Sequence, residues 1–216
     1  MYPMKIDVLV ADESHIRYTD EICEEILISA RERGTGIARR TPEYLTEKIN
    51  RFDERIEELA SAERYEEKVK HMSCLLGIKT HTALSMIVEV GGFERFEKAP
   101  RFASFLGLVP SEDSSDQKIN RYSITKAGNS HLRRLLVEAA QSYTRGTIGH
   151  KSVATKQRQQ GNPPEVIAYA DKANERLRRR FYKMTLNKGI NRNVATTAIA
   201  RELACFIWGM MTEHVV

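Results

Sequence analysis

Apolar residues recur at helical spacing along most of the chain beyond residue 41. The first such stretch carries Leu45, Ile49, Phe52, Ile56 and Leu59. Their spacing of 4, 3, 4 and 3 is a heptad seam, which predicts a long amphipathic, coiled-coil-like helix over residues 41–72. Thr41 fits the N-cap and Pro42 the first helical position. Because the seam extends little more than two heptads, a helix packed on its own domain and a dimeric coiled coil fit it equally well.

The same periodicity continues toward the C-terminus. It predicts helices over residues 100–107, 130–143, 165–188 and 193–212. The segments 111–129 and 146–164 are rich in turn residues and predict loops. The fold class predicted is therefore all-α. The predicted organisation is a poorly defined N-terminal segment (1–40), the long helix (41–72) and a helical domain (73–216).

A helix-hairpin-helix pattern opens the helical domain. Gly77 separates two short apolar stretches, as expected for two helices joined by a tight turn. Such a hairpin points backbone N–H groups and a helix N-terminus at a phosphate. The usual pattern has a second glycine two residues after the first, where this chain has Lys79, whose side chain can itself reach a phosphate. A purely structural pair of helices fits about equally well.

Composition excludes several classes of protein. The chain has 216 residues, and its 12 Gly and 6 Pro are too few for a loop-rich β-sandwich. No apolar run approaches the roughly 20 residues that span a bilayer. Cys23, Cys74 and Cys205 lack the spacing of a zinc or redox motif. We therefore expect a cytoplasmic protein with reduced thiols and no membrane contact.

Charge is distributed unevenly along the chain. The net charge is +5 overall, but residues 111–201 hold eighteen Lys and Arg against seven Asp and Glu. Residues 43–70 hold six against nine. The C-terminal half thus suits a polyanionic partner, with an ordinary solvated basic surface as the alternative.

Residues 107–140 carry the most specific signal. They contain GLVPSEDSSDQK and then SITKAGNSHLRRLLVEAA. This stretch resembles the C-terminal domain of the DEDD-type insertion-sequence transposases, the family that includes the Piv DNA invertase. The family pattern there is roughly GL-P, a Ser-Ser-Gly-Gly-Lys-like loop, and ITK-GN--LR--L-EAA. Residues 75–96 and 181–208 are similar to neighbouring parts of that domain, so the resemblance covers about residues 43–212.

The resemblance implies DNA recombination. In the family, an N-terminal RuvC-like domain supplies three Asp and one Glu that bind divalent metal such as Mg²⁺, and the C-terminal domain supplies a serine. The serine is thought to attack a DNA phosphate, and a structured guide RNA is thought to select the DNA. Alignment on Lys118 puts the family's serine at Ser115, with Ser114 as the second candidate. Asp116 and Gln117 stand where the family has Gly-Gly.

Basic residues around the serine segment are candidate DNA contacts. Lys118, Lys126 and Arg133 flank the serine loop and the following helix N-terminus. Arg178, Arg179 and Arg180 form a cluster suited to phosphate geometry, with a solvated helix face as the alternative. The six His residues show no ligand spacing, so we assign no metal to this chain.

The resemblance leaves the acidic domain unaccounted for. About forty residues precede the long helix, too few for an RNase-H-like sheet with its acidic ligands. Two functions follow as hypotheses. The chain is either the serine-bearing, DNA-binding part of a transposase that needs an acidic domain from elsewhere, or a nucleic-acid-binding module without catalysis. Because recombination joins two DNA partners and the heptad seam can pair two chains, we expect a homodimer.

Overall fold

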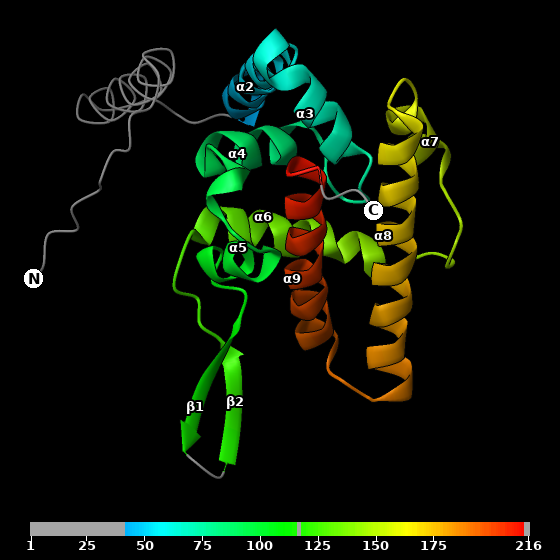
Figure 1. Ribbon diagram of the computed structural model, residues 1–216. Coiled ribbons are helices and arrows are strands. Elements are labelled where there is room, and N and C mark those ends of the chain that lie inside the picture. Colours follow the sequence, from blue (N-terminus) through cyan, green and yellow to red (C-terminus); the bar gives the residue numbers. More distant parts are fainter. Residues whose placement is uncertain (1–41, 116–117, 214–216) are drawn as a thin grey trace, which may run out of the picture. The chain divides into compact units, whose positions relative to one another are not determined.

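The described part of the protein contains eight α-helices, one β-hairpin, two short 3₁₀-helices (η2, Phe93–Arg95, and η3, Gln141–Thr144) and a π-helical segment (η4, Lys183–Asn187). The computed structural model describes residues 42–115 and 118–213, with side chains for residues 44–111 and 123–213. The helices are α2 (Pro42–Ala60), α3 (Glu63–Ser73), α4 (Thr80–Val90), α5 (Ala99–Phe105), α6 (Ser130–Ala140), α7 (Val153–Gln159), α8 (Pro164–Tyr182) and α9 (Arg192–Met211). The predicted all-α class is confirmed. Figure 1 shows the helices and the hairpin along the chain.

Two helices, rather than one continuous helix, cover the region where the seam predicts residues 41–72. The chain divides into compact units 1–50 and 51–216, and the unit boundary falls inside α2. The helical path breaks at Ala62, whose φ of −66° and ψ of 140° are extended. Within the second unit, the break lets Leu59 of α2 and Met72 of α3 both pack on one core. The apolar residues at the C-terminal end of the seam are therefore explained by burial in this core.

Helix α9 is the centre of the core. It packs against α5 and α6 on one side and against α8 on the other (Figure 1). Its residues Ala195, Ile199, Leu203 and Ile207 are fully buried. Helix α9 has 20 residues and a mean hydropathy of 1.3, values that would suit a membrane span. Half of its apolar stretch is, however, buried inside the fold. Packing on α3, α5, α6 and α8 accounts for its apolar composition.

A β-hairpin stands where the sequence predicts a loop over residues 111–129. Strands β1 (Pro110–Ser115) and β2 (Lys118–Ile124) pair antiparallel. The hairpin, which we call the ribbon, projects away from the helices in Figure 1. The sequence prediction was wrong because β1 reads PSEDSS and gives no alternation of apolar and polar residues. Likewise, α7 lies inside the loop predicted over residues 146–164.

Candidate nucleic-acid interface

The two candidate serines lie at the far end of the ribbon. Ser115 is the last residue of β1, and its backbone pairs with Lys118, the first residue of β2. At a rise of about 3.3 Å per residue, the five steps from Pro110 put the Ser115 backbone roughly 17 Å from the root of the ribbon. The side chains of Ser114, Ser115 and Lys118 lie outside the described residues, so their predicted roles stay predictions.

The root of the ribbon is fixed by backbone hydrogen bonds. They run from Thr125 N to Val109 O (2.9 Å), from Lys126 N to Gly107 O (3.2 Å) and from Asn129 N to Phe105 O (3.2 Å). Gly128 sits between them with a φ of 138°, and a Cβ atom built there would be 2.1 Å from the carbonyl oxygen of Phe105. Glycine is therefore required at this position by both conformation and space.

Asn129 joins the ribbon root to two helices. Its Oδ1 accepts a hydrogen bond from the backbone N–H of Leu132 at 2.9 Å, so Asn129 is the N-cap of α6. Its Nδ2 donates to Glu89 of α4 at 2.7 Å. His131 Nδ1 contacts the other carboxylate oxygen of Glu89. Glu89 thus holds the start of α6 against α4.

The cations around the ribbon root differ in what they contact. Arg133 is half-buried, and its Nη1 donates to the carbonyl oxygen of Leu106, just beyond the end of α5, at 3.0 Å. Its guanidinium therefore holds the ribbon root. Lys126 is exposed, with a φ of 55°, and has no acidic partner among the described residues. Of these two predicted phosphate contacts, Lys126 is the one open to a ligand.

Helices α3 and α4 and the loop 74–79 form the predicted helix pair. Lys79 is exposed at the N-cap of α4, where no side chain in the described part of the chain caps the backbone N–H groups. A groove of about 870 Å³ beside it is lined by both basic and acidic residues, among them Lys70, Lys79, Arg158, Glu57 and Glu66. Gly77 has a φ of 87°, and a Cβ atom there would be 2.3 Å from the carbonyl oxygen of Ala139. Packing against α6 therefore explains this glycine.

The three consecutive arginines of α8 point to three different partners. Arg178 Nη1 donates to the carbonyl oxygens of Thr147 (2.7 Å) and His150 (3.4 Å), so it fastens the loop before α7. Arg179 pairs with Glu175 on its own helix. Arg180 pairs with Glu202 of α9 at 2.7 Å. The predicted cluster is therefore dispersed, because consecutive residues of a helix do not share a face.

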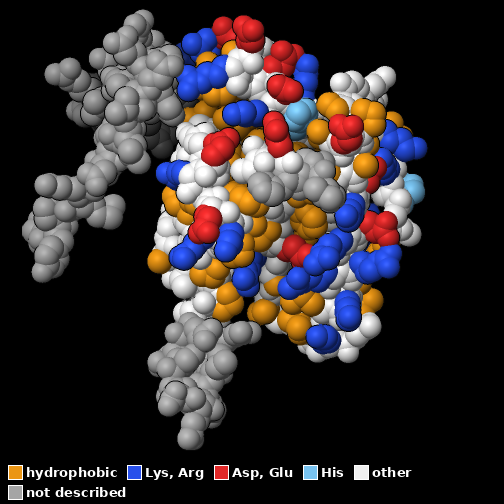
Figure 2. Space-filling view, in the orientation of Figure 1, with side chains coloured by type: hydrophobic (Ala, Val, Ile, Leu, Met, Phe, Trp, Pro, Cys, Tyr) orange, Lys and Arg blue, Asp and Glu red, His pale blue; other side chains and the backbone are white. Residues whose placement is uncertain are grey.

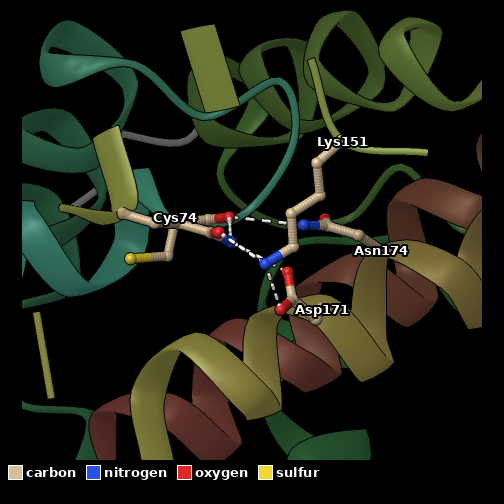
Figure 3. A network of polar contacts seen from close by, with 5 residues as sticks. Cys74, Lys151, Asp171 and Asn174 are labelled. Carbon is tan, nitrogen blue, oxygen red and sulfur yellow. Dashed lines mark hydrogen bonds and ion pairs between the residues drawn. The ribbon is translucent and has the colours of Figure 1, made fainter. Parts of the chain in front are cut away.

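A half-buried polar network joins segments far apart in the sequence (Figure 3). Asn174 Oδ1 accepts hydrogen bonds from the backbone N–H of Leu76 (2.8 Å) and the hydroxyl of Tyr143 (2.9 Å). Its Nδ2 donates to the carbonyl oxygen of Cys74 at 3.3 Å. Burial raises the pKa of the Cys74 thiol to about 11, with a further contribution from the Asp171 carboxylate, so this thiol is not a nucleophile at neutral pH.

Lys151 and Asp171 complete this network. The two side chains form an ion pair, and both also hydrogen-bond to the buried side chain of Gln159, at 3.0 Å each. The network was not predicted from the sequence because its members come from five separate segments, which only the fold brings together. The network ties the loop after α3, the η3 segment at the end of α6, and α7 to α8.

The described residues do not offer a metal site. No group of three or more His, Cys, Asp or Glu side chains within that part of the chain is arranged to hold an ion. His81 and His131 lie with ring centroids 6.5 Å apart, but only one carboxylate, Glu89, accompanies them. We therefore derive no chemical step through a metal held by these residues.

Comparison with known proteins gives consistent matches. Residues 70–162 match the family described as Transposase IS116/IS110/IS902 family. The chain is 38% identical over 66% of its length to y4qE of Sinorhizobium fredii, a protein named as a transposase. It is 28% identical over 88% of its length to the transposase of insertion sequence element IS1111A from Coxiella burnetii. It is 32% identical over 62% of its length to the transposase of element IS1533 from Leptospira borgpetersenii.

These matches support the interpretation that the chain is part of an insertion-sequence transposase. The match to each relative covers only 36%, 48% and 39% of that relative's own length, in the order given. The family match includes the C-terminal end of α3, all of α4 and the ribbon.

Proposed function

We propose that this chain is a DNA-binding part of an insertion-sequence transposase and that Ser115 is its nucleophile. The proposal starts from the transposase family match over residues 70–162. The observation that carries it is the position of Ser115 at the tip of a ribbon whose root is rigidly held. A two-stranded ribbon also has the dimensions to enter the major groove of DNA.

The proposed reaction is a transesterification at a DNA phosphate. The Ser115 hydroxyl loses its proton to a base, and its Oγ forms a bond to phosphorus. One bridging P–O bond of the DNA strand breaks, and the departing deoxyribose oxygen takes up a proton. One phosphoester replaces another, so the broken strand stays covalently attached and the reverse step can join it to a new end.

The groups that activate this hydroxyl come from outside the described helices. A serine hydroxyl is a weak nucleophile without an adjacent base or metal. The ribbon holds the Ser115 backbone roughly 17 Å from the ribbon root, beyond hydrogen-bond reach of side chains there. We propose that an acidic domain binding Mg²⁺ acts at the ribbon tip. The relatives are long enough to contain such a domain, since the chain spans less than half of each.

Substitution of the two serines tests the proposal. We expect Ser115→Ala to abolish a covalent protein–DNA adduct on duplexes carrying the element ends, with Mg²⁺ and the acidic domain of a relative supplied. Ser114→Ala, the matched control, keeps the adduct, because only one hydroxyl is aligned for in-line attack. Denaturing gel electrophoresis detects the adduct. DNA binding, measured by fluorescence anisotropy, stays within about twofold for both variants because no phosphate-contacting charge is removed.

Three outcomes would contradict the proposal. An adduct that survives Ser115→Ala but disappears with Ser114→Ala would move the nucleophile by one residue. No adduct with the unmodified chain, together with retained DNA binding, would favour the non-catalytic nucleic-acid-binding module. DNA affinity that does not change with salt would exclude both functions, because each neutralised phosphate lowers log K by about 0.9 per log unit of salt.

The N-terminal half of α2 carries the proposed dimer contact. Leu45, Ile49 and Phe52 continue the heptad seam but are 44%, 58% and 38% exposed. Knobs-into-holes packing is self-complementary, so a second copy of the chain is the partner that fits this spacing. We expect a dimer at tens of micromolar, and Ile49→Lys should convert it to a monomer by placing a charge in the seam. Light scattering measures the mass. Glu54→Lys, exposed and off the seam, should remain dimeric, and a monomeric unmodified chain would overturn the proposal.

A further inference from the structure

A second cationic surface lies between α8 and α9, away from the ribbon. A groove of about 550 Å³ separates the two helices. Three arginines line it: Arg176 and Arg180 from α8, one turn apart, and Arg201 from α9. In Figure 2, Lys and Arg side chains gather over the region of these two helices. Among these arginines, sequence analysis assigned a DNA contact only to Arg180.

Glu202 sets the geometry of the groove. Its side chain is only 12% exposed, and its two oxygens accept separate hydrogen bonds. Arg176 Nε donates to Oε1 at 2.6 Å, and Arg180 Nη1 donates to Oε2 at 2.7 Å. Two flexible side chains are thereby held in fixed positions by one carboxylate on the neighbouring helix.

Most of the donor capacity of these arginines remains open. A guanidinium has five N–H donors, and each of these two gives one nitrogen to Glu202. Within the described residues neither has a second acceptor, and their side chains are 65% and 47% exposed. Arg201 has no acidic partner in that part of the chain. The groove thus holds three positive charges against one negative charge.

The residues beside the arginines hold the two helices together and add no negative charge to the groove. The Tyr169 hydroxyl donates to the Phe206 carbonyl oxygen at 3.2 Å, and the two rings meet edge to face at 5.7 Å. Burial raises the pKa of the neighbouring Cys205 thiol, so it stays neutral at physiological pH. An anion that enters the groove therefore meets oriented guanidinium donors and one carboxylate that is already satisfied.

Stability alone does not account for this arrangement. Solvent screens these ion pairs at their arginine ends, which are 65% and 47% exposed, and one arginine would be enough to neutralise Glu202. Placing three arginines around a single carboxylate leaves a net charge of +2 on one surface, which costs repulsion unless an anion is bound. Phosphate is the anion whose oxygens match forked guanidinium donors.

We propose that the α8–α9 groove binds the sugar–phosphate backbone of duplex DNA and that Glu202 positions Arg176 and Arg180 for it. This inference rests on the proposed DNA-binding function, and it adds a contact surface separate from the ribbon. The DNA contacted here is held by its backbone and not read by sequence, because guanidiniums that contact phosphates carry no base information.

The direction in which Glu202→Gln changes DNA affinity distinguishes a positioning role of Glu202 from a simple effect of its negative charge. If Glu202 were only a negative charge near DNA, Glu202→Gln would tighten binding. If Glu202 orients the two arginines, Glu202→Gln weakens binding, by about threefold or more at low salt, and lowers the salt slope. The probe is a fluorescent 30-base-pair duplex of random sequence, titrated with the full chain between 50 and 200 mM NaCl. Circular dichroism melting verifies that the variant is folded.

Arginine variants provide an independent measurement. Arg201→Ala is expected to weaken duplex binding by about tenfold at 50 mM NaCl and to lower the salt slope by about 0.9, the value for one phosphate contact. Lys68→Ala is the matched control, because Lys68 is an exposed cation of α3 and does not line the groove. It should bind within about twofold of the unmodified chain.

The possible failures are distinguishable. An unmodified chain that does not bind the duplex would refute the proposed function itself. Two results would overturn only the groove, provided that the unmodified chain binds the duplex normally. One is Glu202→Gln binding that is equal or tighter, and the other is Lys68→Ala binding that is as weak as Arg201→Ala binding. An RNA hairpin of equal charge that displaces the duplex at a tenfold lower concentration would overturn the assignment to DNA.

Discussion

Replacing Gly128 by alanine is expected to destabilise the protein by about 3–5 kcal/mol. Two costs add at this position. A φ of 138° is a region that residues with a Cβ atom rarely adopt, and the new methyl group would lie 2.1 Å from the Phe105 carbonyl oxygen. Relief of that overlap requires the α5 terminus and the ribbon root to separate. Urea denaturation followed by circular dichroism measures the free energy of unfolding.

Gly161→Ala is the matched control for this prediction. Gly161 also has a positive φ, 83°, but nothing lies within 4 Å of a Cβ atom built there. Its substitution therefore costs only the conformational strain, about 1–2 kcal/mol. Equal destabilisation by the two substitutions would mean that the close approach of Gly128 to Phe105 does not matter for stability.

Substitution of Asn174 by alanine is expected to cost about as much, for a different reason. Asn174 satisfies the backbone N–H of Leu76 and the Tyr143 hydroxyl, and alanine removes the acceptor of both. The Cys74 carbonyl also loses the Asn174 donor and keeps only the longer hydrogen bond from Gln159 Nε2, at 3.4 Å. An unsatisfied buried polar group costs about 1–3 kcal/mol, so we expect a loss of about 3–5 kcal/mol. For a chain of this size, a melting temperature lower by roughly 10 °C would report it.

A double-mutant cycle isolates the mechanism of this loss. Tyr143 is fully buried, and burial raises its pKa well above the usual range. Tyr143→Phe removes the hydroxyl that Asn174→Ala would leave unpaired. Asn174→Ala should therefore cost about 1 kcal/mol less when it is added to the Tyr143→Phe variant. Asn193→Ala, an exposed change in the first turn of α9, serves as the control. Strict additivity would argue against the hydrogen-bond explanation.

Helical periodicity was sufficient to predict most of the fold. The faces of α6, α8 and α9 carry apolar residues at helical spacing, and the Asn129 cap has a specific chemical signature. The break between α2 and α3 was not predictable in the same way. Ser61 and Ala62 are ordinary helix residues, and the chain turns there because the core lies on one side.

The candidate site was predictable only in part. The sequence motif located Ser115 and Lys118, but the ribbon that carries them has no apolar pattern, so its strands were read as a loop. Arg133, which follows the serine loop, and Arg178, from the arginine cluster, were both predicted to contact phosphates. In the structure, Arg133 and Arg178 each donate a hydrogen bond to a backbone carbonyl oxygen. These carbonyls lie 27 and 31 residues away in the sequence, so local sequence patterns do not predict the contacts. Glu202 was missed because an isolated acidic residue has no motif.

The central place of α9 has a consequence for how the protein is made. Trp208 Nε1 donates to the Phe96 carbonyl at 3.1 Å across 112 residues of sequence. At about 5–20 residues per second, the ribosome needs roughly 5–20 s to synthesise the chain between them. During that time α5 and α6 emerge with their apolar faces uncovered, because α9, the helix that covers them, follows them in the sequence. Nascent chains of this protein are therefore expected to depend on chaperones until α9 leaves the ribosome, and chains ending before α9 should be degraded or aggregate.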